Sequence, residues 1–327
     1  MTDPVVFALN ASRDFGLHVA RAVGLPLAAH EEREFDDGEH KARPLVNVRN
    51  RDVYVIQSLY GDPRQSVNDK LCRLLFFLAA LRDAAAARVT AVLPYLCYAR
   101  KDIRTQTRDP ITTRYVATLL EAVGVQRVVT LDVHNIGAYQ NAFRCGTEHL
   151  HTAGLFAGRI APMVARGDPV CVVSPDAGGV KRAERLRQRL MRTLDREVQL
   201  AVMEKARGKG VLTPGRLIGE VGDGLAVVVD DMIGTGSTLA YAARACRAQG
   251  ARRVVAAAAH GLFVGEAAAV IGGEELDQVL VTDTVPPFRL PPNLVAAKLG
   301  IVSVVTLFAE AIRRMHDGGS LVELLED

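Results

Sequence analysis

Two adjacent acids, Asp230 and Asp231, follow a run of three valines and precede a turn of Gly, Thr and Ser residues that leads into a helical run over Leu239–Gln249. Three valines in a row are typical of a buried strand. Backbone N–H groups at a helix start are unpaired, and the helix dipole favours negative charge there, so a strand, a small-residue turn and a helix can bind an anion such as phosphate. Because the two carboxylates would repel a phosphate, we expect them to bind ribose hydroxyls or hydrated Mg²⁺ beside it.

The turn itself supplies further phosphate ligands. Gly236 lets the backbone approach a phosphate closely, and the hydroxyls of Thr235, Ser237 and Thr238 add donors. The pattern Asp-Asp-x-x-x-Thr-Gly-x-Thr resembles the ribose-phosphate loop of type I phosphoribosyltransferases and phosphoribosyl pyrophosphate synthetases. The chain differs from many synthetases in one respect, because they carry a further acid where it has Gly234. The alternative interpretation is an ordinary strand-turn-helix connection.

A second segment, residues 94–112, joins a predicted strand end to a basic loop. It is similar to the synthetase signature Pro-Tyr-x-x-Tyr-Ala-Arg-x-Asp followed by Pro-Ile-Thr. The resemblance implies that Arg100 stacks on the adenine of ATP or binds its phosphates, and a planar guanidinium suits both tasks. It places Lys101, where many relatives carry Gln, in the same ATP site. The alternative is a solvated strand tip.

A short acidic turn combines an aromatic residue with three acids at positions 35–39. It resembles the Phe-x-Asp-Gly-Glu segment that, in the synthetases, reaches into the ATP site of the neighbouring subunit and contacts adenine. The resemblance implies that Phe35 lies against the purine, while Asp37 and Glu39 accept hydrogen bonds from its amine or order the loop. It also implies at least a dimer. The alternative is a solvated acidic turn.

Two other strand ends carry candidate Mg²⁺ ligands. Asp132 and His134 are two residues apart at the end of a predicted strand, so we expect them to share one face. Their segment resembles the Asp-x-His motif of the synthetases, whose His meets Mg·ATP, and this implies that His134 binds Mg²⁺ with support from Asp132. The segment at 174–179 resembles the family's Ser-Pro-Asp-x-Gly-Gly turn, which implies that Asp176 binds Mg²⁺, as a second metal ligand, or ribose hydroxyls. The alternative for this segment is a plain turn.

Two cationic pairs follow predicted strands. Lys181 and Arg182 stand in the first turn of a predicted helix, where cations oppose the dipole, and they suit a bound anion such as pyrophosphate. Lys205 and Arg207 enter a glycine-containing loop. A Lys-x-Arg at this position carries the chemistry over the triphosphate in the synthetases, so the resemblance assigns both residues as catalytic. The alternative for this pair is an exposed basic loop.

Short β-rich runs alternate with amphipathic helical runs, which predicts an α/β fold of parallel sheets covered by helices. The predicted strands are Val5–Leu9, Val53–Gln57, Val89–Leu93, Val128–Val133, Val170–Ser174, Val198–Met203, Leu225–Val229, Val254–Ala259 and Gln278–Thr282. The predicted helices are Asp14–Val23, Val67–Ala84, Thr112–Val123, Gly179–Met191, Ser237–Gln249 and Leu307–Met315.

An internal match suggests two related halves. Gly, Arg and His recur at the same spacing in 124–134 and 250–260, each time after a predicted helix. The resemblance implies two tandem type I phosphoribosyltransferase-like domains, each a mostly parallel sheet flanked by helices. We expect residues 1–150 on the ATP side and 151–327 on the ribose 5-phosphate side, with the last helix able to pack back on the first domain.

Composition narrows the class of protein. Of 327 residues, 49% are hydrophobic and 24% charged, and the net charge of +3 is too balanced for a general nucleic-acid or membrane binder. The five cysteines lie far apart, which argues against a metal cluster or a disulfide framework. No apolar run reaches the roughly 18 residues of a membrane span, and no signal peptide is visible. We expect a cytoplasmic protein.

Motifs in the same order over nearly the whole chain identify it as similar to the phosphoribosyl pyrophosphate synthetases. The resemblance implies a ribose-phosphate pyrophosphokinase that transfers the diphosphoryl group of Mg·ATP to the anomeric hydroxyl of ribose 5-phosphate. It further implies Mg²⁺ as cofactor and a homo-oligomer built on dimers, up to a hexamer. Two alternatives are a phosphoribosyltransferase, which uses the same loop, and a non-catalytic regulatory homologue that assembles with active synthetases.

Overall fold

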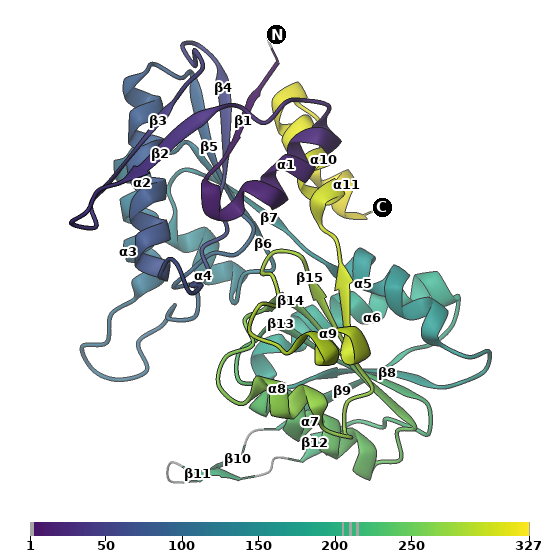
Figure 1. Cartoon of the computed structure of the whole chain (residues 1–327). Coiled ribbons are helices and arrows are strands. Elements are labelled where there is room, and N and C mark those ends of the chain that lie inside the picture. Colours follow the sequence, from purple (N-terminus) through teal and green to yellow (C-terminus); the bar gives the residue numbers. More distant parts are fainter. Residues whose placement is uncertain (1–2, 205, 209–210, 214–215, 327) are drawn as a thin grey trace. The chain divides into compact units, whose positions relative to one another are not determined.

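A five-stranded parallel sheet forms the centre of the first of two units, which comprises Met1–His151 and Val304–Asp327 (Figure 1). The computed structural model describes residues 3–204, 206–208, 211–213 and 216–326. The sheet has the order β1-β4-β5-β6-β7. Its strands are β1 (Val5–Ala8), β4 (Asp52–Ile56), β5 (Arg88–Leu93), β6 (Arg127–Leu131) and β7 (Gly146–Leu150).

Helices cover both faces of this sheet. On one face, α2 (Val67–Asp83) and α3 (Thr112–Ala122) pack their apolar side chains into one core with the strands. Helix α2 begins with a capping box, in which Ser66 and Asp69 exchange side-chain and backbone hydrogen bonds. On the other face, α1 (Arg13–Val23) packs beside α10 (Val305–Asp317), and the rings of Phe15 and Phe308 meet edge to face at 5.8 Å (Figure 1). The C-terminal segment therefore belongs to the first unit.

A hairpin, two short helices and a 3₁₀ turn complete the described part of the first unit. A separate antiparallel hairpin of β2 (His30–Glu34) and β3 (His40–Pro44) packs against α2. The short helices are α4 (Ile136–Ala142) and α11 (Leu321–Glu326), and η1 (Asn10–Ser12) is a 3₁₀ turn.

The second unit, Thr152–Ser303, contains a seven-stranded sheet of order β12-β9-β8-β13-β14-β15-β16. Only β12 pairs antiparallel; every other neighbouring pair in this sheet is parallel. Its strands are β8 (Val170–Ser174), β9 (Gln199–Met203), β12 (Leu217–Ile218), β13 (Leu225–Ile233), β14 (Arg253–Gly261), β15 (Gln278–Thr282) and β16 (Leu299–Val302). A further antiparallel pair consists of β10 (Ala206–Gly208) and β11 (Val211–Thr213).

Two apolar clusters hold the helices of this unit on opposite faces of the sheet. One cluster joins the strands to α7 (Ser237–Ala248), α8 (Ala267–Gly272) and α9 (Pro292–Lys298). The other joins them to α5 (Ala153–Ile160) and α6 (Val180–Leu194). The 3₁₀ turns η2 (Ala161–Met163) and η3 (Ala177–Gly179) follow α5 and β8.

The two sheets repeat one arrangement of strands and helices. The series β5-α3-β6-α4-β7 in the first unit corresponds to β13-α7-β14-α8-β15 in the second. In each series the middle strand follows a helix that ends at a glycine with positive φ, Gly124 at +89° and Gly250 at +98°. Few other residues adopt this conformation, which explains why glycine recurs in both copies. The α/β class with mostly parallel sheets is thus confirmed.

Candidate functional site

The carboxyl edge of the second sheet collects the predicted ribose-phosphate residues. Strand β13 is longer than predicted, so Asp230 and Asp231 lie within it rather than beyond its end. Beyond Val228 it pairs with β14 but not with β8, which exposes one side of the strand end to the turn that follows β8. Ligands of open α/β sheets bind in the crevice at this edge.

The turn after β13 leads directly into the start of α7. Gly236 precedes the helix with φ +80° and provides no side-chain cap for the first-turn N–H groups. Thr235 and Ser237 are exposed, with their hydroxyl oxygens 3.2 Å apart, and Thr238 is half-buried. A Cβ at Gly236 would lie 3.0 Å from Val270 Cγ1, so packing as well as φ favours glycine. Uncapped N–H groups and hydroxyls at one helix start suit a phosphate.

The two acids of β13 share one cation. Arg182 in the first turn of α6 places Nη1 3.6 Å from Asp230 Oδ1 and 3.5 Å from Asp231 Oδ1. Burial and the neighbouring Asp231 carboxylate raise the pKa of Asp230 to about 7, against the lowering effect of Arg182. The pair therefore carries more negative charge than one guanidinium neutralises once both carboxyl groups ionise. The prediction that Arg182 faces a bound anion did not anticipate this partner within the chain.

Asp176 lies in the turn after β8, the strand next to β13. Its Oδ1 accepts a hydrogen bond of 3.1 Å from the N–H of Gly179 and so caps η3. Ser174 Oγ donates to the carbonyl of Asp176 at 2.6 Å. Because β8 and β13 are parallel neighbours, the turn of Asp176 and the acids of β13 lie at the same edge of the sheet.

The carboxyl edge of the first sheet carries the predicted ATP residues of the loop after β5. Arg100 is exposed. Lys101 is half-buried, and its ammonium group pairs with the Asp109 carboxylate and donates to Thr105 Oγ1 at 2.9 Å. These contacts, with hydrogen bonds from the N–H groups of Thr105 and Gln106, hold the pKa of Asp109 far below its ordinary value. In this structure Lys101 therefore joins the two ends of the loop after β5 through its pair with Asp109.

Asp132 and His134 follow β6, the neighbour of β5 in the sheet. The expectation that they share one face is wrong, because β6 ends at Leu131 and Asp132 has φ +38°, which breaks the alternation of a strand. Asp132 is buried, whereas His134 is exposed. His134 thus lies at the same edge as the Arg100 loop, with Asp132 beneath it.

The predicted adenine-binding turn forms the tip of the β2–β3 hairpin. Phe35 is 39% exposed, and the Arg33 guanidinium lies 5.2 Å from its ring centroid. Asp37 Oδ1 accepts from the N–H of Glu39 at 3.0 Å, so this carboxylate orders the tip. The hairpin is a sheet of its own packed on α2, whereas Arg100 and His134 follow strands of the central sheet. An exposed aromatic ring on an ordered tip is consistent with a contact outside its own site.

The predicted catalytic pair is only partly described. Lys205 lies outside the described residues. Arg207 belongs to β10, opposite Leu212 of β11, and its side chain is not described. Residues 206–208 and 211–213 thus form paired strands where the sequence predicts a loop.

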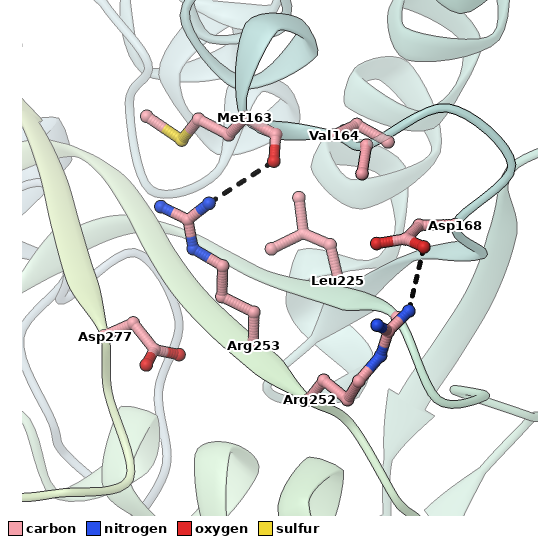
Figure 2. Close-up of a pocket in the computed structure, with 9 residues that line it drawn as sticks. Met163, Val164, Asp168, Leu225, Arg252, Arg253 and Asp277 are labelled. Carbon is pink, nitrogen blue, oxygen red and sulfur yellow. Dashed lines mark hydrogen bonds and ion pairs between the residues drawn. The ribbon is translucent and has the colours of Figure 1, made fainter.

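A cavity of about 350 Å³ lies at the opposite, amino edge of the second sheet, where Leu225 and Arg253 begin their strands (Figure 2). Its arginines are engaged within the chain: Arg253 donates to the carbonyl of Met163 at 3.3 Å, and Arg252 pairs with Asp168 at 2.8 Å (Figure 2). None of the predicted site residues lines it. Asp230, Asp231 and the turn that follows them lie instead at the carboxyl edge of this sheet.

Known proteins similar to this chain cover nearly all of it. The ribose-phosphate pyrophosphokinase of Fusobacterium nucleatum is 35% identical over 320 residues, which are 98% of this chain and 97% of that protein. That of Caldanaerobacter subterraneus subsp. tengcongensis is 38% identical over 98% of this chain and 96% of its own length. The chain belongs to the ribose-phosphate pyrophosphokinase family.

Family domains and a solved structure agree with this assignment. Residues 4–124 match the N-terminal domain of ribose phosphate pyrophosphokinase, and residues 171–326 match the phosphoribosyl synthetase-associated domain. The crystal structure of phosphoribosylpyrophosphate synthetase from Mycobacterium smegmatis has a TM-score of 0.84 at 31% identity and covers 97% of this chain and 100% of its own. The predicted family and the enzyme class, a transferase, are confirmed.

Two relationships in the site were missed from the sequence. Arg182 pairs with Asp230 and Asp231, and Lys101 pairs with Asp109. A signal for the first existed, because a cation in a helix's first turn is unfavourable unless an anion compensates it. For the second, Lys101 and Asp109 flank a basic loop, and opposite charges at its two ends favour closure.

Proposed function

We propose that this enzyme transfers the β,γ-diphosphoryl group of ATP to the anomeric hydroxyl of ribose 5-phosphate, giving phosphoribosyl pyrophosphate and AMP. The observation that carries the proposal is the arrangement of the predicted ribose-phosphate residues at the carboxyl edge of the second sheet. There the start of α7, to which Gly236 gives no side-chain cap, and the hydroxyls of Thr235 and Ser237 follow directly on the acid pair, of which Asp231 is buried and Asp230 half-buried. A phosphate and vicinal sugar hydroxyls need these two kinds of partner side by side.

The roles that we propose for residues of the second unit follow from this arrangement. The N–H groups of Gly236, Ser237 and Thr238, with the nearby hydroxyls, bind the 5-phosphate. Asp230 and Asp231 accept hydrogen bonds from the ribose hydroxyls. This binding holds the anomeric oxygen in place for attack on the β-phosphorus, and such alignment supplies much of the rate enhancement in a displacement of this kind.

The roles of the first unit concern ATP. Arg100 binds adenine or the phosphates, Lys101 orders the loop that carries Arg100, and His134 meets the phosphates from the neighbouring strand end. Phe35, Asp37 and Glu39 contact adenine in the site of a second copy of the chain. In the second unit, Lys205 and Arg207 stabilise charge that grows on the transferred group. As the Pβ–O bond to AMP breaks, AMP leaves with that oxygen, and the anomeric hydroxyl loses its proton.

Mg²⁺ fits the residues present as a cofactor shared with the substrate. No three His, Cys, Asp or Glu side chains cluster as a metal site in the part of the chain that the structure describes. Mg²⁺ commonly keeps several waters and takes one or two carboxylates together with substrate phosphates. Each unit has one residue that would bind it together with substrate phosphates: His134 in the first unit and Asp176 in the second. When bound, it would neutralise charge on the triphosphate.

Assembly and location follow the same proposal. The proposed contact of the hairpin tip with adenine in a second copy requires at least a dimer, and we propose a homo-oligomer built on dimers, up to a hexamer. No helix among the described residues is long and apolar enough to cross a membrane. A cytoplasmic location agrees with the pools of ATP and ribose 5-phosphate that the reaction needs.

Each of the two alternative functions leaves a specific part of the chain unexplained. A phosphoribosyltransferase would use the ribose-phosphate loop alone, whereas this chain also matches the pyrophosphokinase N-terminal domain over residues 4–124. A non-catalytic regulatory homologue would have no need of both Lys205 and Arg207, which this chain keeps.

The decisive assay combines purified protein with ribose 5-phosphate and Mg·ATP and follows AMP. Folded protein that forms no AMP contradicts the proposal. Lys205→Ala refines it, because a residue that acts on the transition state lowers turnover far more than it lowers affinity for ribose 5-phosphate. An equal loss in both would assign Lys205 to ground-state binding instead.

A further inference from the structure

We propose that Arg182 is a positioning residue for the Asp230–Asp231 pair, which it holds in the orientation and charge state that accept hydrogen bonds from the ribose hydroxyls. The inference rests on the proposed role of the pair. It adds a residue of α6, outside the ribose-phosphate loop, that controls the affinity for the sugar.

The geometry joins one guanidinium to two carboxylates. Arg182 Nη1 lies within 3.6 Å of the Oδ1 atoms of both Asp230 and Asp231, and only 15% of the Arg182 side chain is exposed. The contact is an ion pair that joins one guanidinium to both carboxylates. Arg182 therefore stabilises the negative charge of the two carboxylates.

The neighbouring turn is built around this side chain. A Cβ at Gly179 would lie 2.8 Å from Ser174 Oγ and 3.8 Å from Arg182 Nη1. Contact with Ser174 therefore favours glycine at position 179, and Arg182 Nη1 lies beside this turn at an ordinary contact distance. The position of Arg182 also needs compensation, because a cation in the first turn of a helix faces the positive end of its dipole.

Electrostatics gives Arg182 a measurable effect. Burial and Asp231 raise the pKa of Asp230, and Arg182 lowers it. Other groups at this edge are Asp176 from the turn after β8 and His260 at the end of β14. Loss of the guanidinium would therefore raise the pKa of Asp230 further and leave it protonated at neutral pH. A protonated carboxyl group is a poorer acceptor for a sugar hydroxyl.

The test compares Arg182→Met, which removes the charge at similar length, with Arg185→Met, which removes an equal charge one turn further along α6. Steady-state kinetics are measured from pH 6 to 9 with each substrate varied. For Arg182→Met we expect the KM for ribose 5-phosphate to rise about 10-fold and the acid limb of kcat/KM for this substrate to move up by about one pH unit. The KM for ATP and all parameters of Arg185→Met should stay within about twofold of wild type.

Each outcome decides the matter. An unmoved acid limb, or equal increases in both KM values, overturns the inference, the second because it places Arg182 on the ATP phosphates. If Arg182→Met does not fold, Arg182→Lys takes its place. It keeps the charge and loses the planar fork, so the acid limb should stay while the KM for ribose 5-phosphate rises, and an unchanged KM contradicts positioning. AMP formation by the wild type tests the proposed function separately.

Discussion

His316 Nδ1 lies 2.8 Å from Asp52 Oδ2, although 264 residues separate the two in the sequence. The contact joins the end of α10 to the start of β4 within the first unit. Arg88 adds to it, because its guanidinium bonds both carboxylate oxygens of Asp52 and donates to the carbonyl of Met315 at 3.3 Å. One nearly buried carboxylate thus anchors the C-terminal helix to the amino edge of the first sheet.

Asp52→Asn should destabilise the protein by about 1–3 kcal/mol at pH 7, because it leaves Arg88 and His316 without their charged partner. Burial raises the pKa of Asp52, but hydrogen bonds from Arg88 and His316 outweigh it and hold this pKa below its ordinary value. A carboxyl group whose pKa is lower in the native state than in the unfolded state stabilises the protein at pH values above its unfolded pKa of about 4. This stabilisation is lost as the pH falls below that value. The difference between wild type and variant should therefore shrink at pH 3.

Urea unfolding followed by circular dichroism at pH 7 and pH 3 measures this difference. Asp83→Asn, at an exposed position at the end of α2, is the matched control and should change stability by less than about 0.5 kcal/mol. Equal effects of the two substitutions at pH 7 would show that Asp52 is not an anchor.

Asp230→Asn should stabilise the substrate-free enzyme at pH 8, by about 1–3 kcal/mol, while it weakens binding of ribose 5-phosphate. The pKa of Asp230 is raised to about 7, well above that of an unfolded Asp. Between about pH 4 and pH 7 the native state consequently holds a proton that the unfolded state has lost, so wild-type stability falls as pH rises through this window. Asparagine removes the buried charge and still offers an oxygen to the N–H of Asp231, which Asp230 Oδ1 now accepts at 2.8 Å.

Thermal unfolding at pH 5 and pH 8 without substrate is the measurement for Asp230→Asn. The gain should be present at pH 8 and small at pH 5, and Asp223→Asn, exposed before β13, should show no gain at either pH. Destabilisation by Asp230→Asn at pH 8 would mean that Arg182 more than compensates the burial of this carboxylate.

The strands could be predicted from the sequence because buried parallel strands are runs of β-branched residues. Val170–Ser174 and Gln278–Thr282 match prediction residue for residue, and every other predicted strand overlaps an observed one. The β2–β3 hairpin could not be predicted, since its strands His30–Glu34 and His40–Pro44 are mostly polar and contain too few apolar residues to set a period. Helix α5 was missed because its glycines weaken a helical pattern.

The loops that carry the candidate site could be predicted from the sequence, but the ion pairs between its side chains could not. Asp230 and Thr235 lie where the motif and the anion-binding start of a helix indicate. The sequence indicates that Arg182 and Lys101 need anionic partners, but which acid each cation reaches is decided only by the folded chain. Asp132 was misplaced because its positive φ ends the alternation of the strand.

Gly236→Ala and Gly234→Ala should show which glycine of this loop is required by its backbone conformation and by the lack of space for a side chain. Gly236 has φ +80°, and a Cβ there would lie 3.0 Å from Val270, so alanine should cost about 1–2 kcal/mol and raise the KM for ribose 5-phosphate. At Gly234 nothing lies within 4 Å of a Cβ and φ is not positive, so alanine should leave the melting temperature unchanged. Differential scanning calorimetry checks both, and equal melting temperatures for the two variants would contradict the demand on Gly236.

A double-mutant cycle on Lys101 and Asp109 should show whether Lys101 touches ATP or acts through its loop. If the pair closes the loop that carries Arg100, then Lys101→Gln and Asp109→Asn each loosen the same element. Each should raise the KM for ATP by about 3–10-fold with little change in the KM for ribose 5-phosphate, and the double variant should be no worse than either single one. Unfolding free energies should change by less than about 1 kcal/mol, because the pair is partly exposed.

Steady-state kinetics of the wild type, the two single variants and the double variant provide the cycle. Additive increases in the KM for ATP would instead assign Lys101 a direct contact with the nucleotide, because two independent interactions add.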